Sequence, residues 1–291
     1  MKPFIKWVGG KTQLIPSILP LIPDDFGTYY EPFLGGGALF FTLRSAREKF
    51  RACLNDLNTD LINTYRVVRD SPQGLIDLLT EWKKDYMRNP EPFFYEIRAN
   101  EKKGLRTDEE MAARFIFLNK TAFNGLYRVN KKGGFNAPWG KYENPPICDS
   151  DNILACSEAL GNAHLYSGQY RYVLDNTTYS DGVYLGGSMC VTAGDVVYFD
   201  PPYVPLNPTS NFTAYTSEGF GLQQQKELAE TFKMVASTGA CVILSNSDTP
   251  IVRELYKDFE ILTVSARRNI NSKGDARGKI NEVLVCCRSK T

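Results

Sequence analysis

The sequence contains a single histidine, His164, among its 291 residues. A Ser-His-Asp or Cys-His hydrolase, or a histidine-rich metal site, would have to be built on that one side chain. His164 lies in the run AHLYSG, which predicts a packed position on a strand. The scarcity of histidine therefore argues against these catalytic classes, and we assign His164 no chemistry.

The cysteines are odd in number and show no CxxC spacing. They are Cys53, Cys148, Cys156, Cys190, Cys241, Cys286 and Cys287. This pattern favours neither a disulfide framework nor a zinc site. We expect reduced thiols in the core and no bound metal.

Long apolar runs and an excess of one charge are also missing. No run approaches the roughly 20 apolar residues that span a bilayer, and the start MKPFIKWVGGK lacks the apolar core of a signal peptide. The net charge is +1, from 34 basic and 33 acidic residues, so any nucleic-acid surface must be local. We expect a cytoplasmic protein that binds no membrane and is a monomer or a weak dimer.

What is present begins with a glycine loop. The stretch TYYEPFLGGGALFFTLR predicts a strand ending near Glu31, a loop at Gly35 to Gly37 and a helix from about Ala38. RACLNDLNTDLINTYRVV predicts a second strand ending near Asp56, then another helix. Such a loop lets a cofactor approach a helix amino terminus, and a following acid can accept hydrogen bonds from ribose hydroxyls. A helix-capping role for Asp56 is the alternative.

The middle of the chain predicts helices without strands. One helical face is formed by Leu75, Leu78, Leu79 and Trp82. Thr107 with Glu110 forms a capping box ahead of the next helix. From residue 119 to 146 the sequence is rich in glycine, asparagine and proline, with aromatic residues among basic ones. We expect a hairpin there with its turn near residues 132–134.

Alternation of strands and helices resumes in the last third. GDVVYFD predicts a short buried strand, followed by a helix, the strand ACVILSN, a helix starting at Pro250, and a closing hairpin of FEILTVSA with INEVLVCC. Asp200 then lies at the carboxyl end of a strand, where open α/β sheets bind ligands. A strand that leaves the core through a proline turn, with Tyr203 at the edge, is the plainer alternative.

Several motifs in this order carry a family resemblance: FIKWVGGK, EPFLGGG, LNDLNTD, FNGLYRVNKKGGFNAPWGKY, FDPPY, NFTAY, LSNSD and RRNINSKG. Together they resemble the Dam-like DNA adenine-N6 methyltransferases, of the D12 class and the α group, nearly end to end. One departure is the stretch of residues 171–194, which is longer than expected before the DPPY strand.

The resemblance implies a fold and a division of the chain. It implies a Rossmann-like, mostly parallel α/β sheet with a closing antiparallel hairpin, interrupted by a smaller helical and hairpin domain. Residues 1–58 and 147–291 would form the catalytic methyltransferase domain, and residues 59–146 the target-recognition domain that binds DNA. The implied reaction transfers a methyl group from S-adenosylmethionine to adenine N6 in double-stranded DNA, within GATC, after the base flips out.

The resemblance also implies which residues act. The catalytic motif is Asp200, Pro201, Pro202 and Tyr203: the Asp200 carboxylate and the Pro201 carbonyl would accept the two N6 protons, and Tyr203 would stack on the base. Cofactor binding is implied for Trp7, Lys11, Phe33, Gly35, Gly37, Asp56 and Asp200. For Trp7, a purely structural place in the core is the alternative.

DNA contacts are expected on two basic segments, residues 120–143 and 267–279, where basic side chains alternate with aromatic ones in the first. The resemblance implies guanine contacts by Arg128 and Lys6. The full set of expected DNA-binding residues is Lys6, Asn124, Leu126, Arg128, Lys131, Pro138, Tyr142 and Lys273.

Three other functions stay open on the sequence. A cytosine-N4 methyltransferase also acts on an exocyclic amine, but it typically carries SPPY where this chain has Asp200. A nicotinamide-dependent oxidoreductase would use the same loop and acid, yet GGG matches GxGxxG poorly and DPPY would have no role. A catalytically silent DNA-binding module is the third, and the intact acid and tyrosine of the motif do not favour it.

Overall fold

The computed structural model describes residues 1–9, 11–47, 50–99, 107–130, 133–175, 179–180, 183–184, 189–206, 220–267 and 279–287. The helices are α1 Ile15–Ile18, α2 Ala38–Ala46, α3 Thr59–Asp70, α4 Pro72–Arg88, α5 Pro90–Ala99, α6 Asp108–Thr121, α7 Ser150–Leu160, α8 Leu222–Ser237 and α9 Pro250–Leu255. The strands are β1 Thr28–Glu31, β2 Arg51–Asp56, β3 Ala163–Ser167, β4 Tyr179–Ser180, β5 Val183–Tyr184, β6 Val196–Phe199, β7 Cys241–Ser247, β8 Glu260–Arg267 and β9 Lys279–Cys287. Short 3₁₀ turns are η1 Leu19–Leu21, η3 Phe123–Gly125 and η4 Tyr170–Val173.

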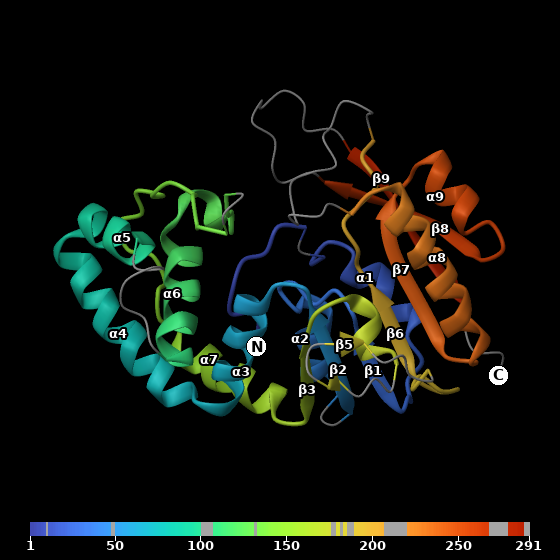
Figure 1. Cartoon of the computed structure of the whole chain (residues 1–291), viewed down its shortest axis with the longest axis horizontal. Helices are drawn as coiled ribbons and strands as arrows, with labels where there is room; N and C mark the ends of the chain where they lie inside the picture. Colours follow the sequence, from blue (N-terminus) through green and yellow to red (C-terminus); the bar gives the residue numbers. More distant parts are fainter. Residues whose placement is uncertain are drawn as a thin grey trace. The chain divides into compact units, whose positions relative to one another are not determined.

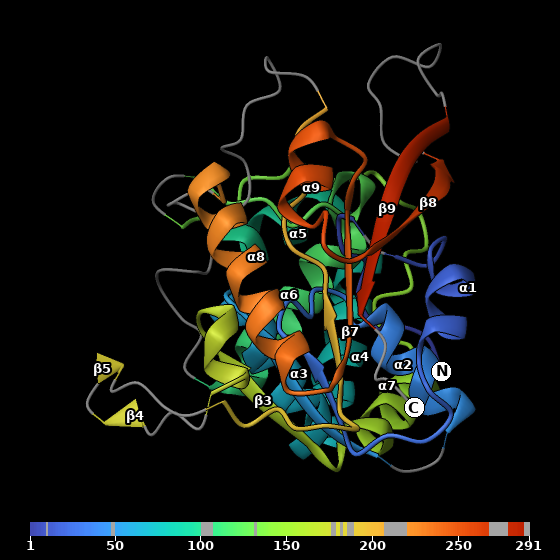
Figure 2. The ribbon, with the colours of Figure 1, turned by 90° about the vertical axis from the view of Figure 1, so that its right-hand side faces the viewer.

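Seven of the described strands form one sheet in the order β3-β2-β1-β6-β7-β9-β8 (Figure 1). Strands β4 and β5 form a separate antiparallel pair (Figure 2). Strand β1 pairs in parallel with β2 and with β6, and β6 pairs in parallel with β7. Strand β9 runs antiparallel to both β7 and β8. The predicted α/β fold, mostly parallel with a closing antiparallel hairpin, is confirmed.

The central strands β6 and β7 are buried along their whole length. Figure 2 shows α8 on one side of β7 and α1 on the other, so both faces of the strand are covered. Leu228, Phe232 and Val235 of α8 are fully buried in this core. A strand covered on both faces needs apolar side chains at every position, which explains the unbroken runs VVYF and CVIL.

The chain divides into two compact units. The first comprises Met1–Gly10, Leu34–Lys49 and Asp56–Gly168, and the second Lys11–Phe33, Phe50–Asn55 and Gln169–Thr291. The division into a catalytic domain and a target-recognition domain at residues 59–146 concerns function, and it stays a prediction.

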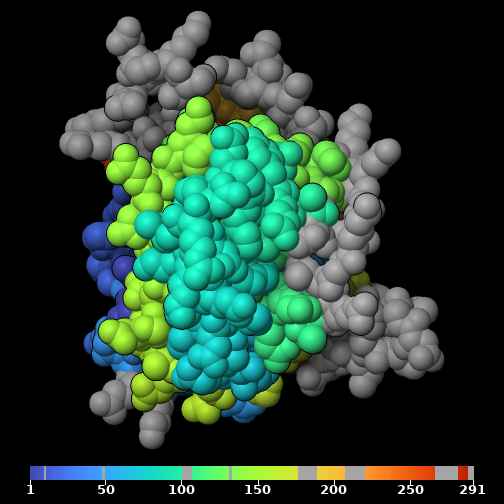
Figure 3. All heavy atoms as spheres, turned by 90° about the vertical axis from the view of Figure 1, so that its left-hand side faces the viewer, coloured from blue at the N-terminus to red at the C-terminus, as the bar shows by residue number. Residues whose placement is uncertain are grey.

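Helix α6 is the centre of the helical part of the first unit. It begins at the predicted capping box, in which Thr107 accepts from the Glu110 backbone and Glu110 accepts from the Thr107 backbone. Its Phe117 is buried and meets the edges or faces of Trp82, Tyr86 and Phe93 from α4 and α5. The outer sides of α4 and α5 form the face seen in Figure 3. The aromatic cluster anchors α6, whose carboxyl end leads into the hairpin.

The expected packing of His164 and of the cysteines can be compared with the structure. His164 lies on strand β3 as predicted, but it is exposed, so its packing was predicted wrongly; the strand alternates between buried and exposed residues, and His164 falls on the outer face. All seven cysteines are free thiols. Cys53, Cys156, Cys241 and Cys286 are buried as expected, whereas Cys148, Cys190 and Cys287 are only half-buried. No helix in the described part of the chain has the length and apolarity to cross a bilayer.

Candidate active site and nucleic-acid interface

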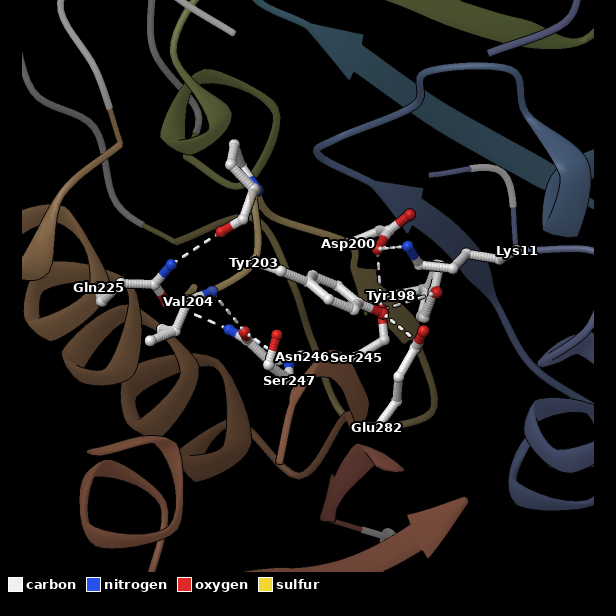
Figure 4. A network of polar contacts seen from close by, with 11 residues as sticks. Lys11, Tyr198, Asp200, Tyr203, Val204, Gln225, Ser245, Asn246, Ser247 and Glu282 are labelled. Atoms are coloured by element: carbon white, nitrogen blue, oxygen red, sulfur yellow. Dashed lines mark hydrogen bonds and ion pairs between the residues drawn. The ribbon is translucent and has the colours of Figure 1, made fainter. Parts of the chain in front are cut away.

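Asp200 directly follows β6, at the carboxyl end of a central strand. One of its carboxylate oxygens, Oδ1, lies 3.0 Å from the Lys11 ammonium and accepts a hydrogen bond of 2.9 Å from the Ser245 hydroxyl (Figure 4). Among the described residues no group bonds to the other oxygen, Oδ2, and the side chain is 20% exposed. The carboxylate is therefore held by one oxygen and presents the other.

The charge on Asp200 is set by two opposing effects. Burial raises the pKa of Asp200, whereas the positive charge and hydrogen bond of Lys11, and the hydrogen bond of Ser245, lower it. Ser245 is itself fully buried and shares a 3.0 Å hydrogen bond with the Tyr198 hydroxyl. Lys11 and Ser245 thus favour the ionised form of a carboxylate that its surroundings would otherwise neutralise.

The proline turn after Asp200 leaves one carbonyl available. Pro202 donates no hydrogen bond, but its carbonyl accepts one of 2.8 Å from the Gln225 amide. Within the described residues nothing donates to the Pro201 carbonyl. Within the described part of the chain, Asp200 and the next residue therefore each offer an acceptor without a donor.

Tyr203 is fixed as a flat surface beside these acceptors. Its hydroxyl donates to Glu282 Oε2 at 2.9 Å, and the Lys11 ammonium lies 4.1 Å from the ring centroid. Burial, and the nearby charge of Asp200, raise the pKa of Tyr203 well above its ordinary value, so the hydroxyl remains a donor. Glu282 thus holds the hydroxyl of Tyr203, and Lys11 lies over its ring.

In the first unit, Asp56 fastens the glycine loop. Its Oδ2 accepts from the Gly35 backbone N–H at 2.9 Å, and its Oδ1 accepts from the Asn58 backbone N–H, also at 2.9 Å. The cap of α3 is Asn58, whose side chain accepts from Leu61. The helix-cap alternative for Asp56 is therefore only partly right: the acid braces the cap residue and the loop together. Burial raises the pKa of Asp56, and these backbone donors oppose the rise.

The glycine loop has a backbone that other residues would strain. Gly35 and Gly37 have φ values of +49° and +65°, in the left-handed region. A Cβ on Gly35 would lie 2.7 Å from Cδ1 of Trp7, and the Gly35 carbonyl accepts from the Tyr65 hydroxyl at 3.1 Å. Trp7 packs against this loop, so the loop needs both its glycines and its bare backbone.

The two aromatic residues expected at the cofactor each lie in a stack. Trp7 is half-buried and stacks on Tyr127 and Phe115, with ring centroids 5.5 and 6.1 Å apart. Phe33, in the second unit, stacks on Tyr170 at 5.2 Å. Neither ring is fully buried, so each keeps an accessible part for a ligand.

The expected hairpin is present between Val129 and Phe135, which form an antiparallel bridge, and Gly133 turns it with a φ of +83°. Arg128 lies at its base: Nε donates to Asn136 Oδ1 at 2.7 Å and Nη2 donates to the Asn136 carbonyl at 2.9 Å. Asn136 thus occupies the side of the guanidinium, while its outer end, with Nη1, makes no bond within the described residues. The exposed end is the fork that can bind two acceptors in parallel.

A buried amide joins the other expected DNA-binding residues. Asn119 accepts from the Lys6 backbone N–H at 2.8 Å and donates to the Lys6 carbonyl at 2.7 Å and to the Gly125 carbonyl at 3.2 Å. Gly125 lies between Asn124 and Leu126, so one side chain sets both the Lys6 segment and this loop. Lys6 and Asn124 are exposed, and Leu126 is half-buried.

Tyr142 and Pro138 support the same loop from the far arm of the hairpin. The Tyr142 hydroxyl accepts from the Asn124 backbone N–H at 3.1 Å, and the Pro138 carbonyl accepts from the Phe123 backbone at 2.8 Å. Asn124 needs this support because its φ of +57° is unfavourable for a residue with a side chain. Lys131, Lys273, the motif NFTAY and residues 268–274 of RRNINSKG lie outside the described residues.

Comparison with known proteins decides the family. The family model for D12 class N6 adenine-specific DNA methyltransferases matches residues 7–186 and 189–270. The chain belongs to this family. It is a DNA methyltransferase that acts on N6 of adenine.

Its relatives cover almost the whole chain. It is 42% identical to a type II methyltransferase, M1.LlaDCHI, of Lactococcus lactis subsp. cremoris, over 98% of this chain and 95% of the relative. It is 39% identical to a type II methyltransferase, M.MjaIII, of Methanocaldococcus jannaschii, over 98% of each. It is 34% identical to a DNA adenine methylase of Vibrio cholerae, over 97% of this chain and 94% of the relative.

The structure adds residues to this methyltransferase that the sequence analysis did not name as site residues. They are Ser245, Asn246, Gln225 and Glu282 around the DPPY turn, and Asn119 and Asn136 around the hairpin. Ser245 and Asn246 lie within the motif LSNSD, so the motif was a signal for them. Gln225 had none: it is one of three consecutive glutamines on a helix, and only its burial in the fold distinguishes it.

Proposed function

We propose that this methyltransferase uses S-adenosylmethionine as its methyl donor and methylates the adenine of GATC after flipping that base out of the duplex. The observation that carries the proposal is a pair of acceptors, Asp200 Oδ2 and the Pro201 carbonyl, to which no described residue donates, beside the fixed ring of Tyr203. Adenine has two N–H donors on its exocyclic amine and a flat ring. The two acceptors can bind the two N–H groups, and the Tyr203 ring can stack on the base. The resemblance of the motifs to Dam-like enzymes supports the target sequence.

The acceptors prepare the amine as a nucleophile. The lone pair of adenine N6 is delocalised into the ring, and two acceptors that bind its two hydrogens draw the pair back onto nitrogen. When N6 gains a methyl group it also gains positive charge, which the Asp200 carboxylate stabilises before a proton leaves. Because Lys11 and Ser245 hold Oδ1, the carboxylate does not need to reorient during this step.

The residues expected to hold the donor fit a nucleoside group. S-adenosylmethionine carries its own leaving group, so it supplies the methyl without a metal or a histidine. Asp56 still has lone pairs for ribose hydroxyls while its two oxygens hold the loop, and the positive φ values of the buried Gly35 and Gly37 let the chain turn tightly ahead of α2. Trp7, Lys11, Phe33 and Asp200 complete the set of residues that we propose for donor binding.

Asp56→Ala is expected to weaken S-adenosylmethionine binding by about 1 to 3 kcal/mol, because charge-assisted hydrogen bonds are lost and the glycine loop is released from its brace. DNA affinity should change less. Equilibrium titration of the donor measures the effect, and Asp77→Ala, which removes an exposed acid on α4, is the control. An unchanged donor affinity would show that Asp56 only supports Asn58 and the glycine loop and does not bind the donor.

Lys11→Met is expected to shift the acid limb of the methylation rate to higher pH. Burial raises the pKa of Asp200 and Lys11 lowers it, so without Lys11 the pKa rises further. If the ionised carboxylate is the active form, the rate falls as the pH drops through that pKa, and the fall then begins at a higher pH. Single-turnover rates between pH 5 and 9 measure the shift, with Lys2→Met, on the exposed Lys2–Asp149 pair, as the control. An unchanged acid limb would show that Lys11 does not control the ionisation of Asp200.

The flipped base requires a surface that replaces its lost stacking. Tyr203 is proposed for this role because its ring is held by Glu282 and by Lys11. Sequence specificity is tested with short duplexes that contain GATC or one altered base pair, each incubated with S-adenosylmethionine labelled in its methyl group. We expect the label in the GATC duplex, and equal labelling of the altered duplexes would contradict the proposed target.

A further inference from the structure

Two buried amides touch the backbone of the DPPY turn on both sides of Tyr203. Gln225, on α8, donates to the Pro202 carbonyl at 2.8 Å, and Asn246, on β7, accepts from the Val204 backbone N–H at 3.0 Å. The amides also bond to each other, from Asn246 Nδ2 to Gln225 Oε1 at 3.2 Å (Figure 4). Both side chains are 0% exposed, so water cannot replace either partner.

The polarity of this pair is fixed by its partners. The Pro202 carbonyl only accepts, so Gln225 must present its NH₂ group there. The backbone N–H groups of Val204 and Ser247 only donate, so Asn246 must present its oxygen to both. The NH₂ group of Asn246 is then free to donate to the oxygen of Gln225, which is the hydrogen bond observed. Neither amide can flip without placing two donors or two acceptors face to face in a buried site.

We propose that Gln225 and Asn246 are positioning residues that act as one clamp, which fixes the turn so that the Pro201 carbonyl stays free and aimed at the substrate amine. This rests on the proposed roles of Asp200, Pro201 and Tyr203. The ring of Pro202 locks its φ, so once Gln225 holds the Pro202 carbonyl the peptide before it has little freedom left. Asn246 holds the peptide group after Tyr203. The backbone on both sides of the Tyr203 ring is therefore fixed by a hydrogen bond to a buried amide.

The clamp is expected to act on the chemical step. Gln225→Ala and Asn246→Ala should each lower the single-turnover methylation rate about 10- to 100-fold, since small displacements of reacting groups cost rates of that order. Dissociation constants for S-adenosylmethionine and for DNA should stay within about threefold of the wild-type values, because the substitution removes no ligand contact. The double variant should be about as slow as the slower single variant, since either substitution already opens the clamp.

Gln225→Glu gives a readout that a merely structural residue would not change. The substitution keeps the shape of the side chain, and its carboxyl group can donate to the Pro202 carbonyl only when it is protonated. The ratio of the variant rate to the wild-type rate should therefore fall as pH rises through the pKa of this carboxyl, whereas the same ratio for Gln225→Ala should be flat. The charged groups around the turn, Lys11, Asp200 and Glu282, are present in every protein compared, so any effect that the proteins share drops out of the ratio.

Thr231→Val is the matched control. Thr231 is a buried polar residue on the same helix, but its hydroxyl bonds to the Glu227 carbonyl and to Tyr170 and does not reach the turn. It should keep the wild-type rate, even where its thermal midpoint falls as far as that of Gln225→Ala. Equal slowing of the control and of Gln225→Ala, a flat pH ratio for Gln225→Glu, or additive effects in the double variant would each overturn the clamp.

The clamp and the proposed function fail in different ways. If Asp200→Ala keeps the wild-type rate, the role of Asp200 is wrong whatever the amide variants do. If Asp200→Ala is inactive while Gln225→Ala and Asn246→Ala are fully active, the proposed chemistry stands and the clamp is wrong.

Discussion

Asp200→Ala is expected to abolish methyl transfer, with a loss of at least about 10³-fold in the single-turnover rate, because the variant lacks the carboxylate that we propose accepts an N6 proton and stabilises the charge developing on nitrogen. The protein should remain folded. The side chain lies at the end of β6 and is 20% exposed, so its removal opens no large cavity. Donor binding is expected to weaken as well, since Lys11 loses its ion pair with the Asp200 carboxylate.

Asp200→Asn separates charge from shape in the same assay. Its amide keeps one oxygen for Lys11 and Ser245, but it places an NH₂ group where the carboxylate presented Oδ2. We expect this variant to be nearly as slow as Asp200→Ala, because a donor now faces the donor groups of adenine. Transfer near the wild-type rate in either variant would remove Asp200 from the chemistry.

Arg128→Ala is expected to relax the preference for GATC over duplexes altered at one guanine by about 1 to 3 kcal/mol, the discrimination of a bidentate arginine–guanine contact. Asn136 occupies the side of the guanidinium, so the outer end is the fork available for the O6 and N7 atoms of guanine. Methylation rates on a set of single-base-altered duplexes measure the effect. Equal slowing of every duplex, with the wild-type rank order kept, would make Arg128 a backbone contact.

Two lysine variants provide the contrast. Lys131→Ala and Lys273→Ala are expected to weaken binding to all duplexes alike, because a lysine on a phosphate contributes affinity with little sequence information. Each should also flatten the dependence of binding on salt by about one phosphate contact. A change of sequence preference in either lysine variant would show that Arg128 is not the only residue that recognises the DNA sequence.

The elements around the site follow from local signals in the sequence. Strands β6 and β7 were predicted from unbroken apolar runs, the start of α6 from the Thr107 capping box, and the hairpin turn from the glycines near residue 133. In each case the deciding residues are neighbours in the chain. The position of Asp200 followed from the strand before it, since a residue that ends a central strand of an α/β sheet lies at the ligand edge.

The supporting contacts could not be predicted in the same way. Val204 and Asn246 are 42 positions apart, and Lys6 and Asn119 are 113 apart, so only the completed fold brings them together. Glutamine and asparagine are common on surfaces, and nothing in LQQQKEL distinguishes the buried Gln225 from the exposed Gln223. His164 shows the converse: its strand was recognised, but its side of the strand depends on which face of β3 is covered.

The most direct test of the account is to identify the base and atom that the wild-type protein modifies. Unmethylated DNA is incubated with S-adenosylmethionine carrying a deuterated methyl group, digested to nucleosides and analysed by mass spectrometry. The account predicts that the label appears as N6-methyladenine, and that sequencing places it within GATC. Label in N4-methylcytosine, or DNA that stays unlabelled while the protein binds it, would contradict the assignment of Asp200 and the DPPY turn to adenine chemistry.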